Sequence, residues 1–116
     1  MEYAIENEYL IVTVTTWGAQ VKSVVRKFDD VEHMWQADKS VWGYHAPILF
    51  PHTGKVVDDL IETKGEVYQA KQHGFARLME HTLVRQTEDT IVLAGDISWA
   101  MRLTDTRRDF EFLQSL

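Results

Sequence analysis

Short runs that alternate between apolar and polar residues, each ended by a turn signal, recur along most of this sequence. In the run YLIVTVTT (residues 9–16), Leu10 and two valines lie on one side of an extended chain, and Ile11 and two threonines lie on the other. The β-branched content also favours a strand. A second strand is predicted over residues 19–28, between a break at Gly18 and a turn at Asp29-Asp30.

The later part of the chain repeats this pattern. Residues 56–63 and 66–70 predict a hairpin, because Lys64-Gly65 between them allows a tight turn with positive φ. Further strands are predicted at residues 81–87, 90–95, 98–103 and 109–114. A short helix over residues 99–107 is the alternative for one of them, since Trp99 and Leu103 are four positions apart. The expected fold is mostly β: an antiparallel meander, sandwich or open barrel.

Residues 31–51 follow neither the helical nor the strand period. They are dense in aromatic side chains and are interrupted by Pro47 and Pro51, so an irregular, aromatic-packed segment is expected there.

Length and composition limit the possible functions. With 116 residues and no linker, a single domain spanning residues 1–116 is expected. The net charge of −6 would repel a phosphate backbone, so nucleic acid is not an expected partner. Charged residues interrupt every apolar stretch, so no membrane partner is expected. The absence of cysteine and of signal-peptide features at the N-terminus favours a cytoplasmic location.

No complete catalytic set or metal site is visible in the pattern of polar residues. The five histidines lie at spacings that match none of the usual local ligand motifs, so neither a metal nor another cofactor is expected. Four carboxylates lie in or beside the predicted hairpin, where solvated charge is the expected role: Asp58, Asp59, Glu62 and Glu66.

The motif QHGFAR (residues 72–77) is the strongest candidate for a binding site. Gly74 permits an unusual backbone path, and Phe75 can anchor the segment in a core. His73 can donate or accept a proton, and Arg77 offers a planar set of donors to hydroxyls or an anion. Taken alone, the motif also fits an ordinary loop that holds two polar residues.

Several ordered motifs together resemble the aldose 1-epimerase, or mutarotase, family. They are WQADKSVWGYHAPILFPHTGKV (residues 35–56), YQAKQHGFAR (residues 68–77) and the opening IENEYLIVTVTTWGAQVKSV (residues 5–24). The resemblance implies part of a large antiparallel β-sandwich of the galactose mutarotase type, and specifically its N-terminal half. It also implies a small-molecule sugar as ligand and no cofactor.

In that family a carboxylate and a histidine move protons at C1 and the ring oxygen, which interconverts the sugar anomers. The resemblance assigns sugar binding to His73, Arg77 and Lys55, although Lys55 replaces the arginine that the family usually has after glycine. Because large aromatic side chains are usually buried, Trp42 and Phe50 are expected in the core rather than stacked against a sugar.

The catalytic residues remain unknown, because the family's general acid and base have no counterpart in these 116 residues. The isolated chain is therefore expected to be weakly active or inactive.

Two functions remain open: a mutarotase-family protein that binds a free aldose or sugar phosphate, and a non-catalytic carbohydrate-binding or self-associating module. A degenerate protein without a ligand is a third possibility. A partial sandwich leaves strand edges exposed, so pairing with another copy or a second chain is expected.

Overall fold

The computed structural model describes residues 1–96 and 109–115 and is built mostly from β-strands. The strands are β1 (Glu2–Glu6), β2 (Leu10–Thr15), β3 (Gln20–Arg26), β4 (Val31–Glu32), β5 (Leu60–Thr63), β6 (Glu66–Gln69), β7 (Thr82–Gln86), β8 (Thr90–Asp96) and β9 (Asp109–Ser115). Two 3-10 turns, η1 (Val57–Asp59) and η2 (Ala76–Leu78), complete the described elements. The predicted strand at residues 98–103 and the alternative helix at 99–107 lie outside the described residues.

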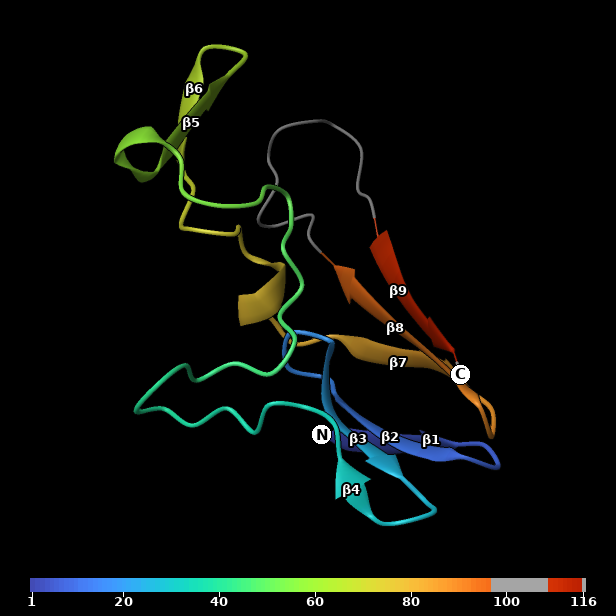
Figure 1. Ribbon diagram of the computed structural model, residues 1–116. Helices are drawn as coiled ribbons and strands as arrows, with labels where there is room; N and C mark the ends of the chain where they lie inside the picture. The colour runs from blue at the N-terminus through green and yellow to red at the C-terminus, as the bar shows by residue number, and fades with distance from the viewer. Residues whose placement is uncertain (97–108, 116) are drawn as a thin grey trace.

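Every strand pair is antiparallel, and neighbours in each sheet are neighbours in the sequence (Figure 1). The sheets have the orders β1-β2-β3-β4, β5-β6 and β7-β8-β9. This confirms the predicted meander. The predicted hairpin is also present, and both Lys64 (φ 49°) and Gly65 (φ 78°) have the positive φ of a type I′ turn.

Sequence reasoning missed two strands and misplaced the start of a third. Strand β1 was not predicted, and the two-residue β4 lies inside the segment that was expected to be irregular. The predicted strand at residues 56–63 begins instead as η1, because Asp58 and Asp59 both have positive φ, which no strand allows.

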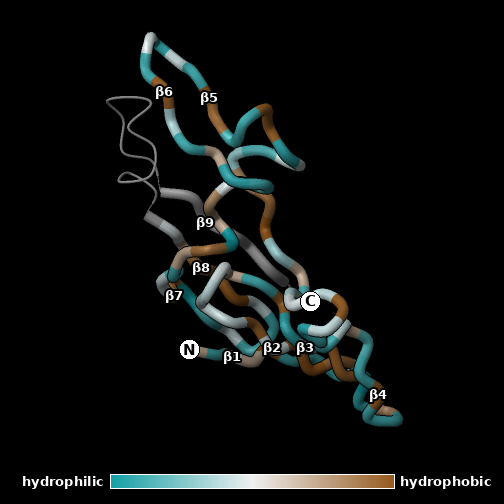
Figure 2. The backbone as a smooth tube through the Cα atoms, turned by 90° about the vertical axis from the view of Figure 1, so that its left-hand side faces the viewer, coloured by the Kyte–Doolittle hydropathy of each residue, from teal (hydrophilic) through white to brown (hydrophobic). Residues whose placement is uncertain are grey.

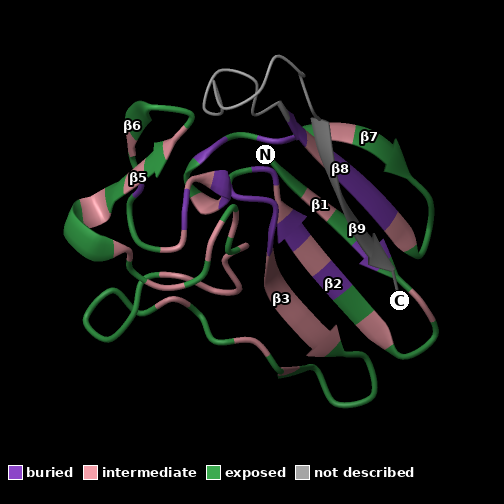
Figure 3. Ribbon diagram, turned by 90° about the horizontal axis from the view of Figure 1, so that it is seen from above, coloured by how far each residue is buried: buried purple, intermediate pink, exposed green. Residues whose placement is uncertain are grey.

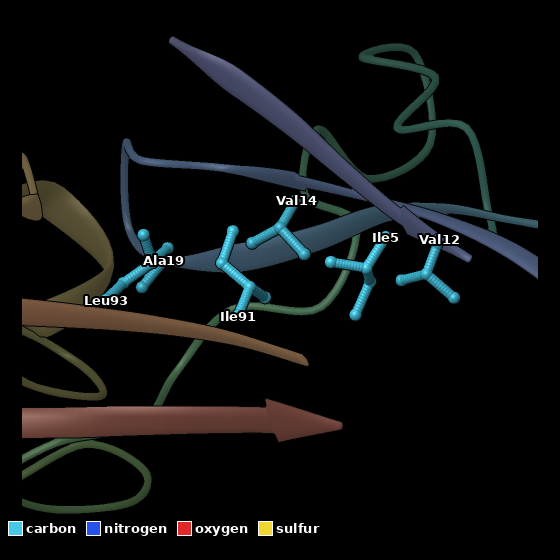
Figure 4. Close-up of a cluster of buried hydrophobic side chains, with 6 residues drawn as sticks. All are labelled: Ile5, Val12, Val14, Ala19, Ile91 and Leu93. Atoms are coloured by element: carbon cyan, nitrogen blue, oxygen red, sulfur yellow. The ribbon is translucent and has the colours of Figure 1, made fainter. Parts of the chain in front are cut away.

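The core lies between the first four strands and the three-stranded sheet. Its buried side chains come from both layers (Figure 4): Ile5, Val12, Val14 and Ala19 on one side, and Ile91 and Leu93 on the other. Buried positions alternate with less buried ones along β2 (Figure 3). The period of two therefore directs one face of β2 toward the other layer, as in a β-sandwich. On β8 the three consecutive residues Ile91, Val92 and Leu93 are all buried, so this strand is covered on both faces there.

The chain is more extended than a compact domain of its length. Its radius of gyration is 16.4 Å, whereas about 13 Å is expected for this number of residues. The hairpin β5-β6 projects away from both layers (Figure 1), and none of its residues is buried. Hydrophobic positions lie along this projecting hairpin (Figure 2). Of the described elements, neither η1 nor η2 is long and apolar enough to cross a membrane.

Burial of His81 makes the stability of this fold depend on pH. The side chain is 2% exposed, its Nδ1 lies 3.2 Å from the carbonyl oxygen of Met79, and burial lowers the pKa of the imidazole. The unfolded chain takes up this proton near the ordinary pKa of 6.5, and the folded chain does so only at lower pH. The contribution of neutral His81 is therefore complete above pH 6.5 and is lost as the pH falls through the folded pKa.

We expect the free energy of unfolding to decrease as the pH is lowered below 6.5, by at most about 1.4 kcal/mol per pH unit from this group. Urea unfolding at pH 7.5, 6.5 and 5.5 measures the slope. The His81→Asn variant, which has no titrating ring, should show a flatter profile. An unchanged slope in that variant would assign the pH dependence to another group.

Candidate functional site

Two distant parts of the chain meet at the QHGFAR motif. Phe50 forms a parallel bridge with Gly74, and the N–H of Phe75 donates to the carbonyl oxygen of Phe50 at 2.9 Å. The N–H of His73 donates to the carbonyl oxygen of Gly54 at 2.9 Å. The rings of Phe50 and Phe75 pack edge to face with centroids 6.0 Å apart, which anchors the motif as predicted. Residues 50–54 and the QHGFAR turn (residues 72–77) thus form one corner.

Gly74 is required for this corner. Its φ is 73°, and a Cβ at this position would lie 2.0 Å from the carbonyl oxygen of Phe50. The predicted unusual backbone path is confirmed, and the glycine also lies where the backbone of Phe50 approaches closely.

The ring of His73 is oriented by the backbone. The N–H of Gly54 donates to its Nδ1 at 2.8 Å, so in the neutral ring the proton lies on Nε2. His73 is half-buried. Its Nε2 forms no hydrogen bond with the residues that the structure describes, and it is not among their buried atoms that lack a partner. This leaves Nε2–H as a fixed donor that can bind a ligand oxygen.

Arg77 lies in η2, on the same turn. Its Nη2 donates to the carbonyl oxygen of Gln72 at 2.8 Å, and its guanidinium carbon lies 4.9 Å from the centre of the Tyr44 ring. A Cβ on Gly18 would lie 2.8 Å from the carbonyl oxygen of Arg77, so the turn also packs closely against the chain between β2 and β3. The guanidinium is therefore held in one orientation.

Lys55 is exposed and directly follows Gly54, whose N–H orients His73. Within the described residues, neither Lys55 nor Arg77 forms an ion pair with a carboxylate. The structure thus places His73 and Arg77 on one turn, each with its side chain in a defined contact, and Lys55 adjoins this turn through Gly54, its neighbour in the chain. Together they can donate hydrogen bonds to hydroxyl, carboxylate or phosphate oxygens.

The remaining candidates have different surroundings. No group of three His, Cys, Asp or Glu side chains that could hold a metal occurs in the described part of the chain. Asp58, Glu62 and Glu66 are exposed, as expected for solvated charge. Asp59 does not fit that expectation, because one of its carboxylate oxygens is buried without a partner among the described residues.

Two aromatic residues also differ from expectation. Trp42 was placed in the core, but it is 48% exposed, because the segment that carries it loops away from both layers (Figure 1). Tyr44 was not recognised as part of the site. Its contact with Arg77 joins positions 33 residues apart, and no local pattern in the sequence signals such a contact.

Comparisons with known proteins identify relatives of this chain in both sequence and fold. Protein LacX of Lactococcus lactis subsp. lactis, in its plasmid and chromosomal forms, is 34% identical over 99 residues. A galactose mutarotase related enzyme from Lactobacillus acidophilus superposes on the whole chain with a TM-score of 0.93 and 34% identity. A galactose mutarotase-like protein from Lactobacillus casei superposes on the whole chain with a TM-score of 0.91 and 27% identity.

These relatives are much longer than this chain. The match covers 81% of the chain but 33% of each LacX protein. The whole chain corresponds to 39% of the Lactobacillus acidophilus structure and 40% of the Lactobacillus casei structure. The sequence profile of the aldose 1-epimerase family matches residues 1–112, nearly the full length. The chain therefore belongs to the aldose 1-epimerase family.

Proposed function

We propose that this chain binds a free aldose or a sugar phosphate at the corner formed by His73, Arg77 and Lys55. The hydrogen bond from Gly54 to Nδ1 of His73 is the observation that carries the proposal, because it turns Nε2–H into a directed donor. A sugar presents several hydroxyl oxygens and a ring oxygen, which accept such bonds. Arg77 and Lys55 add cationic donors without a competing carboxylate in the described residues.

Anomer interconversion is the reaction that family membership suggests, but the proposed role of this chain is binding. By the resemblance, the carboxylate and the histidine that move protons in the family match no residue of this sequence. Loss of an acid or base group costs about 10²–10⁴-fold in rate. We therefore propose that these residues alone accelerate mutarotation weakly or not at all.

His73→Asn tests the binding proposal without disturbing the corner. Asparagine is among the residues that best tolerate the positive φ of 65° at this position, and its amide oxygen can still accept the N–H of Gly54. It lacks a donor where Nε2–H lies. We expect the dissociation constant for sugar to rise roughly 5- to 100-fold, because ligand oxygens lose a partner.

Galactose and galactose 6-phosphate, titrated separately in a calorimeter, measure this affinity for neutral and phosphorylated sugars. His33→Ala, at an exposed histidine outside the corner, is the matched control and should leave both affinities unchanged. Polarimetry of freshly dissolved α-galactose measures any turnover. Equal sugar affinity in the wild-type chain and His73→Asn would refute the proposed site.

The second candidate function is a self-associating interaction module. It is supported by the unburied hairpin β5-β6 and by the many large apolar side chains that are exposed in this structure. An isolated two-stranded hairpin is marginally stable in water, so a partner that covers it would stabilise the fold. We propose a second copy of the chain as that partner.

A further inference from the structure

We infer that Tyr44 is a positioning residue for ligand binding: its ring holds the guanidinium of Arg77 so that Nη1 is presented to the ligand. The inference rests on the proposed function, since it concerns how the same corner grips a sugar or sugar phosphate. Neither the motif QHGFAR nor the family resemblance assigned any role to Tyr44.

The donors of Arg77 divide into used and available ones. Nε is buried and has no partner in the part of the chain that the structure describes. Nη2 donates to the carbonyl oxygen of Gln72 at 2.8 Å. Nη1 forms no hydrogen bond with a described residue, and unlike Nε it is not buried. Nη1 is therefore the nitrogen of the guanidinium that is open to a ligand oxygen.

The Tyr44 ring supplies the contact that a carboxylate usually gives to an arginine. Within residues 1–96, no aspartate or glutamate pairs with Arg77, and its guanidinium carbon lies 4.9 Å from the ring centre. Attraction between the cation and the ring face restrains the guanidinium without occupying its donors. A carboxylate in the same place would compete with the ligand for these donors, whereas the ring leaves them available.

Tyr44 is itself held by its neighbours in the chain. Its ring lies 5.9 Å from that of Trp42, whose carbonyl oxygen accepts the indole N–H of Trp35 at 2.8 Å. On the other side, the N–H groups of His45 and Ala46 donate to the side-chain oxygen of Gln20, which is 8% exposed. The loop thus supports the ring through Trp42 and anchors the backbone that follows it through Gln20, so the irregular segment carries a support for Arg77.

Tyr44→Leu and Tyr44→Phe separate positioning from general packing. Phenylalanine keeps the ring and should keep the wild-type affinity for galactose and galactose 6-phosphate. Leucine keeps apolar bulk but removes the ring face, and the dissociation constant should rise roughly 3- to 10-fold. In an Arg77→Ala background, Tyr44→Leu should cause no further loss, because it acts through Arg77. Tyr9→Leu, at an exposed tyrosine far from the corner in sequence, is the matched control.

A second measurement does not need a sugar. The Nε–H signal of Arg77 in a nitrogen-15 NMR spectrum should carry a ring-current shift from Tyr44, which persists in Tyr44→Phe and disappears in Tyr44→Leu. If the wild-type chain binds no sugar, the proposed function fails, and this signal alone decides whether Tyr44 orients Arg77. Equal sugar affinities for Tyr44→Leu and wild type, equal losses for Tyr44→Phe and Tyr44→Leu, or an Arg77 signal that does not respond to Tyr44→Leu would each overturn the inference.

Discussion

Replacing Gly74 with alanine should destabilise this protein by about 3–5 kcal/mol, which is in the uppermost range for a single substitution. The positive φ of 73° accounts for part of the loss, because a non-glycine residue in a sparsely populated backbone region costs about 1–3 kcal/mol. The larger part is steric. The new Cβ would lie 2.0 Å from the oxygen and 2.4 Å from the carbon of the Phe50 carbonyl, so the two backbones must separate.

This loss should be visible as a lower urea midpoint in tryptophan fluorescence. Domains are typically stable by about 5–15 kcal/mol, and the core here is small, so much of the stability would be lost. Gly65→Ala is the matched control: its φ is 78°, but no atom lies within 4 Å of a Cβ there, so it should cost only about 1 kcal/mol. Similar midpoints for the two variants would mean that the Phe50 carbonyl does not approach Gly74 as closely as the structure places it.

Most of the described strands could be predicted from the sequence because their signal is local. Alternation along β2, together with the turn residues of the β5-β6 hairpin, is enough to locate these elements. Strand β1 was missed although it pairs along its full length with β2, because its short run carries two exposed glutamates and one buried residue, Ile5. Its inward face is defined by pairing within the sheet, where Ile5 lies opposite Val12 of β2 and both are buried in the core, which is information from packing.

The candidate site could be predicted only in part, for a similar reason. His73 and Arg77 stand in a compact motif whose glycine and aromatic residue signal a constrained turn. The contacts that orient them come from Gly54 and Tyr44, 19 and 33 positions away. A hydrogen bond or ring contact over such a distance depends on how the loops fold back, and this has no signature in local spacing. Trp42 shows the same limit, because hydrophobic character alone does not decide which aromatic residues a small core can cover.

The purified chain should have a native mass of at least twice its 13.5 kDa, as expected for the self-association proposed above. The reason lies in the hairpin β5-β6, where Leu60 is 46% and Val67 is 60% exposed, and Val57 in η1 is 83% exposed. Leu60 pairs with Gln69 and Val67 pairs with Glu62, so both apolar side chains lie on the same face of the hairpin. Covering this face with a second copy would remove apolar surface from water.

Size-exclusion chromatography with light scattering, over a range of protein concentrations, measures this mass. The double variant Leu60→Thr with Val67→Thr keeps strand-forming residues but lowers the apolar surface, so it should shift the chain toward the monomer. The matched control, Ile11→Thr with Val84→Thr, changes exposed positions on β2 and β7 and should retain the wild-type mass.

Added salt should strengthen association by screening repulsion between copies that each carry a net charge of −6. A wild-type chain that stays monomeric at high concentration and high salt would rule out the interaction module, and a control pair that dissociates the assembly would place the interface on the outer faces of the sandwich instead.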